Sequence, residues 1–327
     1  MRLKLVPDDT AWRFMAMRRV SVAVSAALLA LSLVALAGLG LNFGIDFRGG
    51  TMIMAETAEP TPVRAWRDAL GPLSVGDVSV TGVSDPASEL AGGPPDAVMI
   101  RIEQGGDDPE IRADAIAAVG AALRDALPSV NILATESVGA KVSGELVQAG
   151  ALAVVLAVFA VLVYIWLRFE WQFAVGAVAA LAHDVVITMG VFALTRLEFN
   201  LSIVAALLTI VGYSLNDTVV VYDRIRENLR RFKTRPLEEV LDLSVNETLS
   251  RTLMTSVTTL IALLALYLLG GEVIRGFTFG MILGVIAGTY SSVFIAAVIL
   301  LRLGVRRDEG EDAAPGAGVK FGSPEAP

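Results

Sequence analysis

Six long apolar blocks constrain this chain of 327 residues more than any other feature of its sequence. The first reads VSVAVSAALLALSLVALAGLGL over 20–41 and has about the ~20 residues that a helix needs to cross hydrocarbon. Five further blocks follow a long polar stretch, at 146–167, 173–195, 201–221, 253–269 and 277–301. Charged residues make up only 18% of the chain, whereas a soluble domain has about a quarter. We therefore predict an integral membrane protein with six transmembrane helices.

The charges of the connectors predict how these helices are oriented. Lysine and arginine gather in the first 19 residues, at Arg168, in the stretch 224–235 and just after residue 301, whereas the turns 196–200 and 270–276 are poor in them. By the positive-inside rule both termini are cytoplasmic, and an even number of spans agrees. The first block also suits a signal peptide, but its length exceeds the usual apolar region of one and favours a retained helix.

Residues 42–145 are then expected on the far, periplasmic side of the membrane. They hold 16 acidic residues against 7 basic ones. Strand patterns at 43–56, 75–83, 97–103 and 130–138 alternate with helix patterns at 61–70 and 108–127. The order βαββαβ is that of a ferredoxin-like α+β domain. The segment 84–96 is rich in turn-forming residues and separates the second and third strands.

The predicted organisation has five parts: a cytoplasmic N-terminus at 1–19, a first transmembrane helix at 20–41, the α+β domain at 42–145, transmembrane helices two to six at 146–302, and a tail at 303–327. The tail is rich in proline, glycine and acidic residues and lacks apolar periodicity, so we expect it to be disordered and cytoplasmic.

Polar groups inside hydrocarbon are costly, so those in the apolar blocks are the best functional candidates. Asn216 and Asp217 lie in the fourth block. If the helix ended early, Asp217 would instead lie at the interface, because it is roughly 6 Å from the end of the block. Arg251 lies at the mouth of the fifth block, where arginines also serve as snorkelling anchors.

The spacing of polar residues links these two helices. Arg251, Thr255 and Thr258 share one helix face. The fourth block carries a similar stripe at Thr209, Tyr213 and Asn216, with Asp217 beside it. We therefore expect Asp217 and Arg251 at comparable depth, as a switchable pair. An ionised aspartate pairs with the arginine, and a protonated one releases it.

His183 and Asp184 lie near the middle of the third block. Two interpretations stay open for them. They form a proton relay or couple neighbouring helices, or they are satisfied by an ordinary interhelical hydrogen bond.

The sequence FGIDFRGG follows the first block and contains Gly44, Asp46, Arg48, Gly49 and Gly50. Its glycines permit tight turns or close packing. Nothing in it resembles catalytic chemistry, and its composition indicates an ordered junction between membrane and domain.

Several classes of function are excluded by what the sequence lacks. It has no cysteine, and its single histidine, His183, excludes a multi-histidine metal site. No phosphate-binding loop, GxSxG or HExxH motif occurs. We expect no enzymatic activity, no cofactor, no metal and no nucleic-acid partner.

Together, FGIDFRGG and the sequence GYSLNDTVVVYDRIREN at 212–228 resemble the signature of the SecD/SecF family of preprotein-translocation subunits. SRTLMTS at 250–256 and the mid-span His183-Asp184 also match, and the resemblance covers residues 12–305. The second motif also contains the family residues Asp223, Arg224, Arg226, Glu227 and Asn228.

The resemblance implies a fold similar to half of a resistance-nodulation-division transporter. A SecD partner would supply the other six spans. The pair would use the proton motive force to help draw preproteins from the SecYEG channel late in export across the bacterial inner membrane. In this family the matching aspartate and arginine, here Asp217 and Arg251, belong to the proton path.

Two alternatives remain. One is a small-molecule or lipid exporter subunit of the same superfamily, although such exporters usually carry both halves on one chain. The other is a scaffold without ion coupling, whose intramembrane polar residues would be replaceable by apolar ones.

Overall fold

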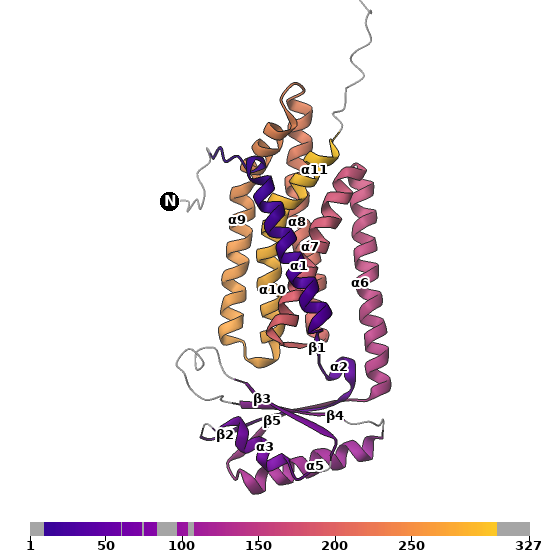
Figure 1. The fold of residues 1–327 in the computed structure, drawn as a ribbon, viewed down its shortest axis with the longest axis vertical. Coiled ribbons are helices and arrows are strands. Elements are labelled where there is room, and N and C mark those ends of the chain that lie inside the picture. Colours follow the sequence, from indigo (N-terminus) through magenta and orange to yellow (C-terminus); the bar gives the residue numbers. More distant parts are fainter. Residues whose placement is uncertain (1–9, 60, 74, 84–96, 104–107, 306–327) are drawn as a thin grey trace, which may run out of the picture.

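In the computed structural model the chain forms a bundle of membrane-spanning helices with an α+β domain at one end (Figure 1). The structure describes residues 10–305 except 60, 74, 84–96 and 104–107. The predicted disordered tail beyond residue 305 and the turn-rich segment 84–96 therefore lie outside the described residues. We call the end of the bundle beside the domain the domain-proximal end, and the opposite end the domain-distal end.

Within this described part, six helices are long and apolar enough to span a membrane, which confirms the predicted architecture. They are α1 (Arg18–Gly38), α6 (Ala140–Arg168), α7 (Trp171–Thr195), α8 (Leu201–Arg231), α9 (Leu237–Leu269) and α10 (Glu272–Ser291). A 3₁₀ turn, η1 (Met15–Met17), precedes α1. The last span continues from α10 through the π-helical turn η2 (Ser292–Ala296) into α11 (Ala297–Leu303).

Two of these helices extend well past the apolar blocks at the domain-distal end. The stretch 224–235, expected as a loop, is helical as far as Arg231. Its charged residues form pairs such as Arg224–Glu227 at i, i+3, which support a helix in water. Helix α9 begins after Pro236, with Glu238 in its first turn, as expected of a helix N-terminus.

The α+β domain has the predicted βαββαβ order. Its elements are β2 (Gly50–Thr57), α3 (Val63–Leu70), β3 (Asp77–Val83), β4 (Ala97–Glu103), α5 (Pro109–Ala126) and β5 (Val130–Val138). The strands form an antiparallel sheet in the order β3-β4-β2-β5. Helices α3 and α5 cover the sheet face that points away from the bundle (Figure 1). They bury a core around Ile53, Trp66, Ile100 and Leu123.

The strand expected at 43–56 is interrupted, and that prediction was wrong in detail. A short helix, α2 (Ile45–Arg48), separates β1 (Asn42–Phe43) from β2. Strand β1 pairs in parallel with β6 (Glu198–Phe199), which lies between α7 and α8. At Gly50 φ is 119°, and an added Cβ would lie 2.6 Å from the carbonyl oxygen of Ile102. Only glycine fits where the chain turns from the junction into the central strand β2.

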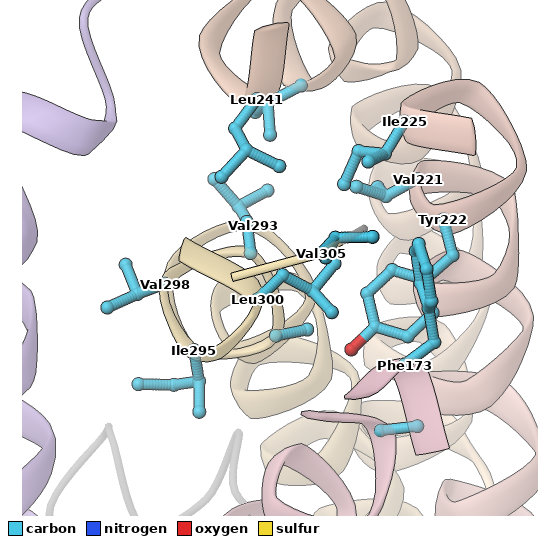
Figure 2. Packing of buried hydrophobic residues seen from close by; sticks show 14 of the residues in the cluster. Phe173, Val221, Tyr222, Ile225, Leu241, Val293, Ile295, Val298, Leu300 and Val305 are labelled. Carbon is cyan, nitrogen blue, oxygen red and sulfur yellow. The ribbon is translucent and has the colours of Figure 1, made fainter. Parts of the chain in front are cut away.

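Aromatic residues mark the domain-distal membrane boundary. Trp12, Trp166 and Trp171 are more than half exposed at this end, as in the aromatic belts of membrane proteins. Inside the same end, the rings of Phe173 and Tyr222 meet edge to face with centroids 5.0 Å apart (Figure 2).

We predict that Gly50→Ala destabilises the α+β domain by about 1–3 kcal/mol, because a side chain is strained at this φ. Denaturant unfolding followed by tryptophan fluorescence measures this, since Trp66 is buried in the domain core and the other three tryptophans are exposed.

The matched control is Gly144→Ala in α6, where an added Cβ meets nothing within 4 Å. Equal unfolding midpoints for the two variants would contradict the assignment of strain to Gly50.

Candidate polar site within the membrane helices

Asp184 is the centre of a hydrogen-bond network that joins three helices. Its side chain in α7 is fully buried. Oδ2 accepts hydrogen bonds from Ser214 Oγ of α8 and from Ser291 Oγ of α10, each at 2.7 Å. Oδ1 lies 3.0 Å from Nδ1 of His183. Both carboxylate oxygens therefore have partners, and these contacts offset the free-energy cost of burying a polar group in an apolar interior.

His183 extends this network toward α1. Its ring stacks on Tyr290 with centroids 6.0 Å apart. The Tyr290 hydroxyl donates to the backbone oxygen of Ser21 at 2.8 Å and shares a 3.0 Å hydrogen bond with Ser25. The Nε2 atom of His183 is buried and has no hydrogen-bond partner among the described residues. The geometry favours the interhelical hydrogen bond for Asp184, and the proton relay stays a prediction.

Asp217 has a different environment, although it is also buried, at 3% exposure. The side chains of Asn216 and Thr255 lie beside its carboxylate, and Arg251 is within electrostatic range. Its Oδ2 has no hydrogen-bond partner in the described part of the chain. Because α8 continues to Arg231, the alternative that the helix ends near Asp217 is wrong.

The pairing of α8 with α9 fixes the relative depth of Asp217 and Arg251. Tyr213 donates to Thr259 Oγ1 at 3.5 Å, and Asp217 lies beside Thr255, four residues further along each antiparallel helix. One more helical turn, about 5.4 Å, brings α9 to Arg251. Arg251 therefore lies about one turn closer to the domain-distal end than Asp217.

The two side chains are neighbours but are not joined. Among the described residues no ion pair links Asp217 to Arg251, and Arg251 is exposed on α9, as Asn216 is on α8. A buried carboxylate oxygen without a partner is costly. Unlike Asp184, Asp217 therefore has a carboxylate oxygen that is available to bind a proton or to contact a cation that moves toward it.

The FGIDFRGG residues form the junction between bundle and domain. Asp46 Oδ2 accepts from the backbone N–H of Leu201 at 2.8 Å, at the N-terminus of α8. Gly44 N–H donates to the carbonyl of Phe199 at 2.9 Å. Arg101 of β4 forms a largely buried ion pair with Glu198, 2.6 Å apart. The junction thus ties the sheet directly to the start of the helix that carries Asp217.

Other motif residues brace the domain-distal end. Asp223 pairs with Arg168 of α6 at 2.9 Å. Arg224 and Asn228 converge on Glu247 of α9, each at 2.7 Å. The remaining contacts of this brace are Arg224–Glu227 (2.6 Å), Asn228–Ser244 (3.0 Å) and Arg226 Nη1 to the carbonyl of Arg168 (3.4 Å). The structure therefore gives these residues a supporting role away from Asp217.

Sequence reasoning missed several partners. The hydrogen-bond partners of Asp184 are Ser214 and Ser291, and Tyr290 extends the network through its contact with His183. In the sequence each of these residues appears only as a hydroxyl side chain within an apolar run. Glu198 was counted only as part of a turn. Among the described residues no group of three or more His, Asp or Glu side chains could hold a metal ion.

Comparisons with known proteins assign the sequence to a family. The family model described as "Protein export membrane protein SecD/SecF, C-terminal" matches residues 118–306, and the "SecD/SecF GG Motif" model matches residues 34–56. The chain is 51% identical to protein translocase subunit SecF of Cereibacter sphaeroides, over 99% of both chains. It is 42% identical to protein translocase subunit SecDF of Brucella abortus, over 94% of this chain and 39% of that protein.

Solved structures agree. The crystal structure of SecDF, a translocon-associated membrane protein from Thermus thermophilus, superimposes with a TM-score of 0.81 at 33% identity, over 93% of this chain and 40% of that one. A SecDF structure in a super-membrane-facing form gives a TM-score of 0.66 at 34% identity with the same coverage.

We predict that Asp184→Ala lowers the stability of the bundle by about 1–2 kcal/mol, because it removes two interhelical hydrogen bonds, each contributing about 0.6 kcal/mol or more, together with the contact to His183 within α7. Ser214→Ala removes one of the two interhelical bonds and should cost about half as much. Thermal unfolding in detergent, followed by circular dichroism, measures both.

Thr209→Ala is the matched control, because within the described residues its hydroxyl bonds only to the carbonyl of Ala205 in its own helix. A melting temperature for Asp184→Ala equal to that of the control would show that the network contributes nothing to packing.

Proposed function

The chain belongs to the SecD/SecF family of protein-export membrane proteins, and on that premise we propose that it works with SecD to promote late-stage preprotein export across the inner membrane, driven by the proton motive force. In this role it is a multi-pass transport subunit of the Sec translocase accessory complex without an enzymatic step. Full-length similarity to protein translocase subunits favours this function over small-molecule or lipid export.

The fused relatives support SecD as the partner. This chain matches about two fifths of SecDF proteins, so the remainder of such a chain corresponds to a second component. Asn216 and Arg251 are exposed on adjacent helices in this chain alone. A partner half covering that face would remove both polar groups from lipid. The translocation channel SecYEG and the moving preprotein are proposed as further partners.

The charge distribution supports an orientation. The arginines of the brace and of the start of α1 lie at the domain-distal end, and residues 42–145 carry an acidic excess. We therefore propose that both termini are cytoplasmic and that the α+β domain is periplasmic.

The single observation that carries the coupling mechanism is the buried Asp217 oxygen without a partner, one turn from Arg251. Ionised, the carboxylate attracts the guanidinium. Once the guanidinium has moved to within about 5 Å of the carboxylate, two unit charges interact by about 3 kcal/mol at an effective dielectric constant of 20. Protonation removes that attraction. A bias of this size changes the ratio of two conformations about a hundredfold.

The same helix connects the site to the domain. Ser214 anchors α8 to Asp184 one turn before Asp217, and the start of α8 is bonded to Asp46 in the junction. A small shift or rotation of α8 that follows protonation of Asp217 would act on the junction and hence on the sheet. We propose this as the route by which proton flow moves the α+β domain.

We predict that Asp217→Asn and Arg251→Met each abolish the gradient-dependent part of preprotein export and leave the gradient-independent part intact. Both remove one charge of the proposed switch. The measurement is late-stage export into inverted membrane vesicles containing the SecD complex, with and without a proton gradient.

The control is Glu239→Gln, which removes an exposed acid near the domain-distal start of α9. It should respond to the gradient as wild type does. If both site variants also kept their full gradient response in assembled complexes, the pair would be structural and the coupling mechanism would be refuted.

A further inference from the structure

Two adjoining cavities lie between the first and last helices at the domain-distal end. The first, which we call the basic cavity, has a volume of about 270 Å³ and is lined by Arg18, Arg19, Glu238, Leu301 and Arg302. The second, which we call the apolar groove, has a similar volume of about 270 Å³. Arg302 lines both, so the two are neighbours.

The basic cavity carries uncompensated positive charge. Glu238 pairs with Arg18 at 2.9 Å, which neutralises one of the three arginines. Arg19 and Arg302 are exposed and have no ion pair within the described part of the chain. Two cations that share one small cavity attract an anion rather than each other, and arginine forks suit phosphate in particular.

The apolar groove leads from these arginines along the helices. Its lining is mostly apolar, with Ser25 and His183 as two polar side chains besides Arg302. The apolar lining residues are Val22, Ala26 and Leu29 of α1, Ala179 of α7, and Ile295, Val298 and Ile299 of η2 and α11. Ile295 and Val298 belong to the same buried cluster as Phe173 and Tyr222, and their side chains lie on the opposite side of the last helix from those two rings (Figure 2).

The length of the groove is informative. From Arg18 to Leu29, α1 rises roughly 16 Å, which is about half of the ~30 Å hydrocarbon core of a bilayer.

We propose that the basic cavity and the apolar groove together form a site for one anionic phospholipid of the leaflet at the domain-distal end. The phosphate lies between Arg19 and Arg302, and one acyl chain lies in the groove between α1 and α11. A free phosphate would use only the arginines. The apolar continuation at the depth of one leaflet is what identifies a lipid. The bound lipid would fasten α1 to the end of the last helix.

Two other cavities show why both features are needed. The cavity lined by Arg168, Arg226, Arg230 and Arg231, together with Asp223 and Glu227, is also basic on balance, but no apolar residue lines it. A cavity of about 720 Å³ between α6, α7 and α8 is almost wholly apolar. Its one cation, Arg48, is already paired with Glu103. Of these cavities in the described part of the chain, the pair beside α1 combines unpaired arginines with an adjoining apolar groove.

The test measures binding of dioleoyl phosphatidylglycerol to the purified full-length chain by native mass spectrometry. Arg19→Gln with Arg302→Gln should weaken the tightest binding about 30-fold, equivalent to about 2 kcal/mol for two interfacial arginines. Glu238→Gln removes the competing carboxylate and should strengthen it about 5-fold. The matched control, Arg230→Gln with Arg231→Gln, removes two exposed arginines at the same end and should leave it unchanged.

The groove is tested separately with Ala26→Phe, which fills it and keeps every charge. Binding of dioleoyl phosphatidylglycerol should fall, whereas binding of the short-chain dihexanoyl lipid should not. Equal losses in the two double arginine variants would reduce the effect to general electrostatics and overturn the proposal. An unchanged affinity in Ala26→Phe would likewise overturn it, because the groove would then hold no acyl chain.

Discussion

The structure depends on one constraint: polar groups placed in a medium without water must find partners within the protein. Asp184 meets it fully, since both of its oxygens are bonded and its partners come from its own helix and from two others. Asp217 meets it only partly. The two acids therefore differ in their surroundings. Asp184 holds helices together, and the role proposed for Asp217 rests on the oxygen that is left without a partner.

The junction connects the α+β domain to the helix that carries Asp217. Its sheet is attached to the bundle through the Arg101–Glu198 ion pair and through Asp46 at the start of α8. An ion pair that is largely withdrawn from water resists separation more than a surface pair does. The sheet and α8 are therefore expected to move as one body, whereas α1 is connected to the junction through Gly40, whose φ is positive.

Much of this could be predicted from the sequence. The six spans and the βαββαβ order follow from periodicity, which is strong in long elements, and β4 and β5 have the predicted bounds. The errors lie where tertiary contacts override local pattern. Residues 43–56 alternate like one strand, but pairing with β6 and the glycine at 50 divide them. The partners of Asp184 could not be found, because a serine in an apolar helix has the same pattern whether or not an acid faces it.

The parallel pairing of β1 with β6 also has a consequence for biosynthesis. The domain lies between residues 50 and 138, so its sheet can close before α6 has been synthesised. The two residues of β6 follow about 60 positions later, after two further helices. Until the third span is inserted, the domain is therefore connected to the membrane through α1 and α6 but lacks the pairing of β1 with β6. The junction between domain and bundle can be completed only after α7 has been inserted.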